Sequence, residues 1–216
     1  MKKLLSIAAL ALLVAASLSA CTTANKKETA SMEGKNGRSS ESRRARSDGR
    51  VVTDEGEAKI LVAYFSWSGN TKDAAQYIAQ KLGADEFEIK REKPYPTEYE
   101  PCREEAHAEI GSRPAIVGKV ENMEQFDVVF VGLPVWAGTA PMPVFTFLEQ
   151  YDFAGKTVIP FCTCYTAASR SLRDIAKATP DSDHRDGLTI VTKELAGKDM
   201  ADKHGQIDDW LAKMGF

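Results

Sequence analysis

The chain has 216 residues, of which 43% are hydrophobic, 27% are charged and 8% are aromatic. This composition is typical of one soluble globular domain with a further segment attached. Residues 58–216 contain 18 basic and 24 acidic side chains, and this negative balance argues against nucleic acid as a partner.

The first 20 residues have the pattern of an export signal. Two lysines precede an apolar stretch over residues 4–18, which is shorter than the roughly 20 residues that a membrane-spanning helix needs. The following sequence, LSAC, resembles the lipobox of bacterial lipoproteins. This resemblance implies cleavage before Cys21, acylation of Cys21 and anchoring in the lipid bilayer on the extracytoplasmic side of the bacterial cell envelope. The alternative is an ordinary cleaved signal with an incidental cysteine.

Residues 22–57, which follow Cys21, are expected to form a disordered tether. They include almost no large apolar residues and show no helical or strand periodicity, so they cannot bury enough surface to fold. The ends of a flexible coil of this length would lie about 30 to 36 Å apart. Arg43, Arg44 and Arg46 are interpreted as a solvated run of charge or as a contact with anionic lipid. The folded domain is therefore predicted to comprise residues 58–216.

Within this domain, apolar stretches of strand length alternate with stretches of helical periodicity. The first unit is a strand over residues 59–65 followed by a helix over residues 70–82. The other predicted strands cover residues 86–90, 126–136, 156–163 and 187–192, and the first of them alternates like an edge strand. The other predicted helices cover residues 103–110, a stretch after Pro143, residues 169–178 and residues 200–214. Three prolines are expected to prevent regular structure before residue 103.

Five strands separated by helices predict an α/β fold. The sheet should be parallel and covered by helices on both faces, because parallel strands that are buried on both sides have nearly continuous apolar sequences. In such sheets ligands bind outside the carboxyl ends of the strands, where the strand order reverses. The loops that follow the strands are therefore the candidate functional segments.

The first such loop has the sequence SWSGNT and is rich in hydrogen-bond donors. The first amides of the following helix lack partners and lie at the positive end of its dipole, and Gly69 allows the chain to bend tightly around an anion. The loop has no lysine and lacks three spaced glycines, which excludes a nucleoside triphosphate loop and a dinucleotide fingerprint. It predicts a site for a monophosphate ester; the alternative is a helix cap without a ligand. The candidate residues are Ser66, Trp67, Ser68, Gly69, Asn70 and Thr71.

Two further segments, PVWAG and TCY, lie at the carboxyl ends of the next two long apolar strands. If the three strands are neighbours, their loops meet in one crevice with a phosphate at one side and an aromatic wall. A flat heterocycle that carries one phosphate would fill this crevice, which describes flavin mononucleotide (FMN). The candidate residues in these loops are Pro134, Val135, Trp136, Ala137, Gly138, Thr163, Cys164 and Tyr165.

Together these motifs resemble those of the flavodoxin family, over residues 58–216. SWSGNT is similar to the phosphate loop of the family, and PVWAGTAP is similar to the segment that flanks the flavin. The resemblance implies FMN as the cofactor and a flavodoxin-like, doubly wound, five-stranded parallel sheet with strand order 2-1-3-4-5, as in the short-chain type. The third loop departs from the common glycine-rich TSGGSG sequence, and Tyr165 is expected either to stack on the ring or to pack on the surface.

The function that this resemblance implies is electron transfer by a flavoprotein outside the cytoplasm, with a redox protein or a membrane quinone as partner. No side chain is assigned a catalytic role and no metal site is expected. One alternative is an FMN-dependent quinone or nitroaromatic reductase, with Tyr95 and Tyr99 in its pocket wall. The other is a surface binding module without flavin, because the third loop is altered.

Cys102, Cys162 and Cys164 leave three alternatives open. One of the latter two could form a disulfide with Cys102, all three could be buried thiols, or a pair could exchange electrons with the flavin. The three histidines lack ligand-like spacing to any cysteine and are expected on the surface or on helices.

Overall fold

The computed structural model describes residues 52–53, 56–195 and 199–216. The predicted export signal, the predicted lipidation site Cys21 and most of the predicted tether lie outside these residues. Near the end of that tether, β1 (Val52–Thr53) pairs with β2 (Gly56–Glu57) in an antiparallel hairpin. Regular structure therefore begins before residue 58. Among the described helices, none has the length and apolar character that crossing a membrane requires.

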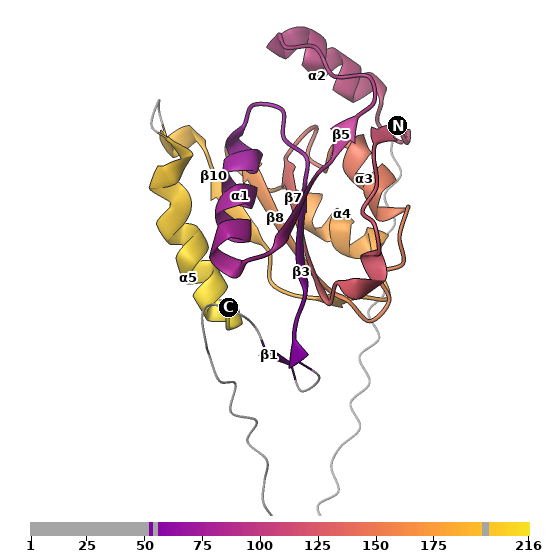
Figure 1. The fold of residues 1–216 in the computed structure, drawn as a ribbon. Coiled ribbons are helices and arrows are strands. Elements are labelled where there is room, and N and C mark those ends of the chain that lie inside the picture. The colour runs from indigo at the N-terminus through magenta and orange to yellow at the C-terminus, as the bar shows by residue number, and fades with distance from the viewer. Residues whose placement is uncertain (1–51, 54–55, 196–198) are drawn as a thin grey trace, which may run out of the picture. The chain divides into compact units, whose positions relative to one another are not determined.

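A parallel sheet forms the centre of the fold (Figure 1). Its main strands lie side by side in the order β4 (Asp85–Glu88), β3 (Ile60–Tyr64), β7 (Val128–Pro134), β8 (Thr157–Cys164) and β10 (Leu188–Val191). In chain order these are the second, first, third, fourth and fifth strands, so the predicted fold and strand order are confirmed. A sixth strand, β9 (Asp183–His184), pairs with the first residues of β8. It was not predicted, because two residues are too short to show a period.

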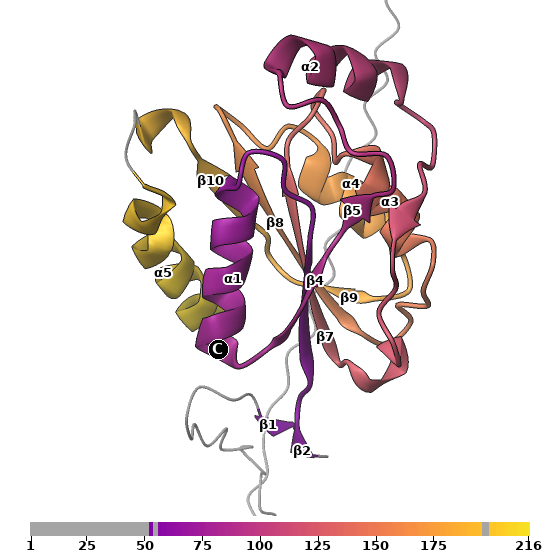
Figure 2. The ribbon, with the colours of Figure 1, turned by 45° about the horizontal axis from the view of Figure 1, so that its top comes forward.

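Helices cover both faces of this sheet (Figures 1 and 2). One face carries α1 (Asn70–Leu82) and α5 (His204–Met214), and the other carries α3 (Met142–Leu148) and α4 (Ser171–Ala178). Alternation along β3 explains both cores: Val62 packs in the cluster with α1 and α5, whereas Leu61 and Ala63 pack in the cluster with α3 and α4. β4 is less buried than β3, as expected of an edge strand.

The segment between β4 and β7 departs most from the sequence predictions. The predicted strand over residues 86–90 divides into β4 and β5 (Lys90–Arg91), and β5 pairs with β6 (Ile116–Val117). α2 (Tyr99–Ala108) begins four residues before the predicted helix start. Pro101 lies in the first turn of α2, where a proline is tolerated because the amide that it lacks would have no helical partner. α2 lies beyond the carboxyl ends of the strands (Figure 2).

Three short 3₁₀ helices complete the described structure. They are η1 (Met123–Gln125), η2 (Lys193–Leu195) and η3 (Met200–Lys203). The predicted closing helix over residues 200–214 is therefore divided into η3 and α5. Its apolar residues still pack against α1, as the predicted periodicity requires.

Candidate functional site

The loops that follow β3, β7 and β8 lie at the carboxyl edge of the sheet, which is the upper edge in Figure 1. β4 and β7 follow β3 in the chain and lie on opposite sides of it. The strand order therefore reverses between β3 and β7, which is the position where parallel sheets of this kind bind ligands.

The loop between β3 and α1 has the geometry that an anion needs. Gly69 precedes α1 with a φ of 95°, a left-handed conformation that favours glycine. It makes no side-chain cap, so the first amides of α1 receive no partner from it. The hydroxyl oxygen of Ser66 is buried and has no hydrogen-bond partner among the residues that the structure describes. A buried hydroxyl without a partner costs free energy, so a phosphate oxygen at this helix N-terminus fits the residues present.

Two residues of this loop fasten it to other segments. Thr71 is buried, and its hydroxyl lies 2.8 Å from the hydroxyl of Thr163 at the end of β8. The indole nitrogen of Trp67 donates to the backbone carbonyl of Pro96, 2.9 Å away, in the connection that leads to α2. The phosphate loop is thus joined by hydrogen bonds to the end of β8 and to the connection that leads to α2.

The loop after β7 is a tight turn between Trp136 and Thr139, which exchange two backbone hydrogen bonds of 2.9 and 3.0 Å. Ala137 and Gly138 have φ values of 48° and 76°, as the two central residues of a type I′ turn require. The Trp136 ring meets the rings of Phe65 and Tyr95 edge to face, at centroid distances of 5.4 and 5.0 Å. Trp136 therefore belongs to an aromatic cluster that also supports the phosphate loop.

The loop after β8 combines buried and exposed residues. Thr163 and Cys164 are buried, whereas the Tyr165 side chain is 75% exposed. Ser169 has a φ of 53°, so a left-handed conformation occurs in this loop without glycine.

One pocket of about 350 Å³ joins the three loops. It brings together most of the predicted residues, namely Trp67, Ser68, Asn70, Pro134, Val135, Trp136, Ala137, Thr163, Cys164 and Tyr165. Ser66, Gly69, Thr71 and Gly138 belong to the same loops but do not line this pocket. Ser66 instead lines an adjacent pocket of about 580 Å³, together with Trp67 and Ser68. The loops meet as predicted, and the role of each residue in binding stays a prediction.

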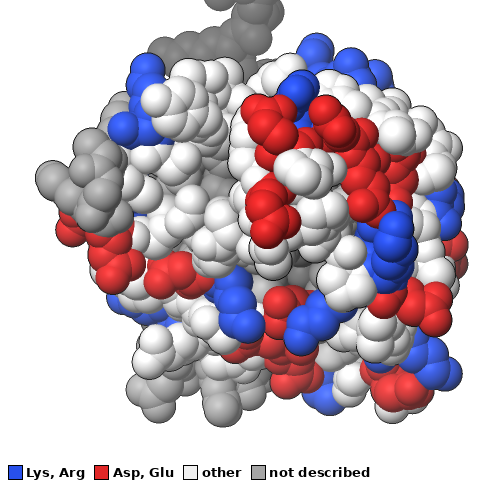
Figure 3. All heavy atoms as spheres, turned by 90° about the horizontal axis from the view of Figure 1, so that it is seen from above, with Lys and Arg blue, Asp and Glu red and all other residues white. Residues whose placement is uncertain are grey.

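Sequence reasoning missed the residues of α2 that line this pocket, which are Tyr99, Cys102, Arg103, Ala106 and His107, and it also missed Thr192 after β10. Of Tyr95 and Tyr99, the two tyrosines proposed for a reductase pocket, only Tyr99 lines it. The sequence predicted a helix only from residue 103, so Tyr99 and Cys102 were expected outside it, and nothing indicated that this face of α2 turns toward the loops. No carboxylate lines the pocket among the described residues; acidic side chains gather on the outer side of α2 (Figure 3).

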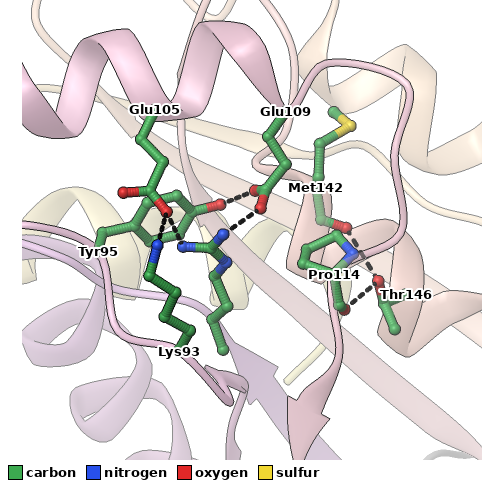
Figure 4. Close-up of polar contacts among 8 residues, drawn as sticks. Lys93, Tyr95, Glu105, Glu109, Pro114, Met142 and Thr146 are labelled. Carbon is green, nitrogen blue, oxygen red and sulfur yellow. Dashed lines mark hydrogen bonds and ion pairs between the residues drawn. The ribbon is translucent and has the colours of Figure 1, made fainter.

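A polar cluster around Glu105 and Glu109 holds α2 in place, away from the face that lines the pocket (Figure 4). Arg91 forms ion pairs with Glu105 of α2 and with Glu109, the residue directly after α2, at 2.5 and 2.8 Å. The Tyr95 hydroxyl donates to the carboxylate of Glu109. Burial, and then this hydrogen bond, raise the pKa of Tyr95 well above its usual range, so Tyr95 stays protonated and keeps donating. Lys93 completes the cluster by contacting Glu105.

All three cysteines of the described chain are free and buried. Of the three alternatives, the one with three buried thiols agrees with the structure, and no disulfide joins any cysteines of the described residues. Burial raises the pKa of Cys162 to about 11 and also raises the pKa values of Cys102 and Cys164. Such thiols are poor nucleophiles at neutral pH. Among the described residues, no group of three or more His, Cys, Asp or Glu side chains is placed to hold a metal ion.

Comparison with known proteins agrees with this arrangement. The sequence profile of a family described as flavodoxin matches residues 59–207. A candidate flavoprotein of Bacteroides eggerthii DSM 20697 is 33% identical, with a TM-score of 0.56 over 65% of this chain and 94% of that chain. A second one, from Bacteroides uniformis ATCC 8492, is 29% identical, with a TM-score of 0.59 over 70% of this chain and 98% of that chain.

A third solved structure, a flavoprotein in complex with FMN from Lactobacillus acidophilus NCFM, shares the fold. It is 22% identical, with a TM-score of 0.56 over 65% of this chain and 97% of that chain. The search of curated proteins found no match. Because the profile spans more than half of the sequence and the strand order agrees with it, this chain belongs to the flavodoxin family.

Proposed function

We propose that this protein binds FMN and transfers electrons through it. The observation that carries the proposal is that Ser68 and Asn70 of the phosphate loop line the same pocket as Trp136 and Tyr165. A ligand with a phosphate at one end and a flat ring at the other is therefore met by matching groups. FMN is such a ligand, and the family assignment and the FMN complex of the Lactobacillus flavoprotein support it as the cofactor.

The residues of this chain would bind and orient the cofactor, and FMN, when bound, supplies the redox chemistry. Neutral hydroxyls and backbone amides at the start of α1 would hold the phosphate. Trp136 and Tyr165 would flank the ring and exclude water from it. No side chain has to take or release a proton for this function.

We also propose that the protein is a lipoprotein, anchored through Cys21 on the extracytoplasmic face of the bacterial cell envelope. The lipobox-like LSAC sequence supports this location. Nicotinamide cofactors are not expected outside the cytoplasm, so the electrons would come from a membrane quinone or a redox protein. The predicted tether would then hold the domain clear of the lipid headgroups.

A second candidate function is that of an FMN-dependent quinone or nitroaromatic reductase. Tyr99 favours it, because this residue adds a largely exposed aromatic side chain to the pocket wall. An electron-transfer protein and a reductase would bind FMN with the same loops, and they differ in whether a small aromatic acceptor is turned over.

The test is to express the full-length chain and to record its visible spectrum before and after addition of FMN. We expect a yellow protein, or uptake of FMN by colourless protein with quenching of flavin fluorescence. Protein that stays colourless and leaves FMN fluorescence unchanged contradicts both redox functions and favours the binding module without flavin. Steady turnover of a soluble quinone by the FMN-loaded protein, supplied with an excess of a chemical reductant that reduces the quinone only slowly by itself, would favour the reductase.

A further inference from the structure

We infer that α2 is an additional wall of the cofactor pocket and that Tyr99, Arg103 and His107 contact the ring of bound FMN. This inference rests on the proposed function, because it assigns new residues to the same site. The three loops predicted from the sequence do not include α2, and the structure places it across the pocket from them.

The pocket-lining residues of α2 form one continuous face of the helix. They are Tyr99, Cys102, Arg103, Ala106 and His107. Their separations of three and four residues place them on the same side of an α-helix. Glu105 and Glu109 extend from a different side, toward Arg91, Lys93 and Tyr95 (Figure 4). The helix therefore has one anchored side and one side that faces the pocket.

The anchored side fixes the position of α2 relative to the loop after β7. The side chains of Arg91 and Glu109 are only 13% and 8% exposed, and the Arg91 guanidinium lies 4.5 Å from the centroid of the Tyr95 ring. The Tyr95 ring in turn meets the Trp136 ring edge to face. A continuous series of contacts thus joins α2 to Trp136, and the pocket face of α2 is held at a set distance from the opposite wall.

The pocket face of α2 is largely uncovered in the chain alone. Helices in proteins are stabilised mainly by burying one face, yet Cys102 is the one buried residue of α2. Tyr99 is 64% exposed and Tyr165 is 75% exposed, and both line the pocket. A flat ring bound there would remove apolar surface of both tyrosines from water.

The size and chemistry of the pocket indicate which ligand α2 meets. A volume of about 350 Å³ is near the lower end of the roughly 300–1,000 Å³ that small-molecule sites enclose. It accommodates one ring system, and the residues of α2 line it together with those of the three predicted loops, so we assign α2 to the cofactor. Arg103 and His107 add N–H donors to this wall. Arg103 already donates to Glu100 through Nε and one Nη, and its remaining N–H groups and the His107 ring suit the carbonyl oxygens on the edge of a flavin ring.

The first experiment measures the dissociation constants of FMN and riboflavin by quenching of flavin fluorescence, with the full-length chain. We expect Tyr99→Ala to raise the dissociation constants of both ligands about tenfold, because the ring is common to them. Ser68→Ala should raise the constant for FMN about fivefold and leave the constant for riboflavin unchanged, because riboflavin has no phosphate. Glu104→Gln, an exposed position outside the pocket-lining face, is the matched control and should stay within twofold for both ligands.

The second experiment follows amide hydrogen exchange of the wild-type chain with and without FMN. We expect exchange to slow in residues 99–108 as well as in the three loops. FMN could bind with an affinity that neither Tyr99→Ala nor His107→Ala changes, and with slower exchange in the loops alone. In that case α2 is not a wall of the cofactor site, and the proposed function stands. If the wild-type chain does not bind FMN, the proposed function and this inference both fail.

Discussion

Thr71 at the start of α1 and Thr163 at the end of β8 are 92 positions apart in the chain, and their hydroxyl oxygens lie 2.8 Å from each other in a buried position. One hydroxyl donates to the other, and this single hydrogen bond joins the start of α1 to the end of β8. The phosphate loop and the third loop are thereby held together beside the pocket, which Thr163 lines.

Replacing either threonine by valine should therefore destabilise the protein. Thr71→Val leaves the Thr163 hydroxyl buried without its partner, and we expect the free energy of unfolding to fall by about 1 to 3 kcal/mol. Thr71→Val combined with Thr163→Val should cost less than the sum of the two single changes, because no unpaired hydroxyl remains. Urea denaturation of the four proteins measures these values; strictly additive costs would show that the hydroxyls do not interact.

Gly69→Ala should disturb the phosphate loop, because Gly69 has a φ of 95°. A left-handed conformation costs a residue with a Cβ about 1 to 2 kcal/mol, so we expect this loss of stability together with weaker binding of FMN. Gly205→Ala in α5 is the matched control: its φ is not left-handed and an added Cβ meets no atom within 4 Å. That change should be neutral or stabilising by up to about 1 kcal/mol. Equal effects at the two glycines would contradict the prediction.

Glu109→Gln should loosen α2. The variant removes a buried charge partner from Arg91 and a charged acceptor from Tyr95, and hydrogen bonds to charged groups contribute about 1.5 to 3 kcal/mol. We expect a loss in this range and faster amide exchange in residues 99–108. Glu149→Gln removes an exposed ion pair with Arg113 and should change stability by less than about 1 kcal/mol. Unchanged exchange in Glu109→Gln would show that the polar cluster does not anchor the helix.

The raised pKa of Cys162 predicts a loss of stability at alkaline pH. The folded protein holds this pKa at about 11, above the reference value of 9.0, so the unfolded chain loses its proton first. The stabilisation is complete below about pH 9 and decreases as the pH rises toward about 11, by roughly 2 to 3 kcal/mol at most. Cys162→Ala removes this dependence, so the difference in unfolding free energy between wild type and variant should narrow over that range. If the plots of unfolding free energy against pH were parallel for the two proteins, the raised pKa of Cys162 would be contradicted.

The proposed lipid anchor depends on Cys21. Each buried methylene of an acyl chain contributes about 0.8 kcal/mol to membrane binding, and two or more chains give stable anchoring. Cys21→Ser should therefore move the protein from the membrane fraction to the soluble fraction after expression in a bacterial host. Mass spectrometry of the wild-type protein should show a lipid-modified N-terminal Cys21. An unmodified mature N-terminus would instead support the ordinary cleaved signal.

The sequence was sufficient for the sheet and for the three loops. The strands are long apolar runs, the helix over residues 70–82 has the predicted bounds, and the loops follow because parallel strands end at one edge. The sequence did not show the hydrogen bond between the hydroxyls of Thr71 and Thr163, because it joins residues that are far apart in the chain; contact of Thr71 with a ligand stays a prediction.

The structure of the segment between β4 and β7 could not be predicted from its apolar pattern. Its strands have only two residues each, which is too short for a period of two. α2 buries one residue and is held by Arg91 through charged side chains, so the apolar pattern that normally predicts packing is absent. The position of α2 over the pocket depends on these specific polar contacts, and hydrophobic periodicity does not report them.

The central strands also determine how much conformational entropy is lost on folding and how much is lost later, when a ligand binds. Val62, Val129 and Phe161 are completely buried. The three loops therefore start from strands, β3, β7 and β8, that are fixed in a rigid core. The conformational entropy of these loops is lost when the chain folds, and a ligand that arrives later does not have to order them again. α2 has no such core beneath it but is held through Arg91 and Glu109, so most of the entropy still to be lost on association belongs to exposed side chains such as Tyr99 and Tyr165.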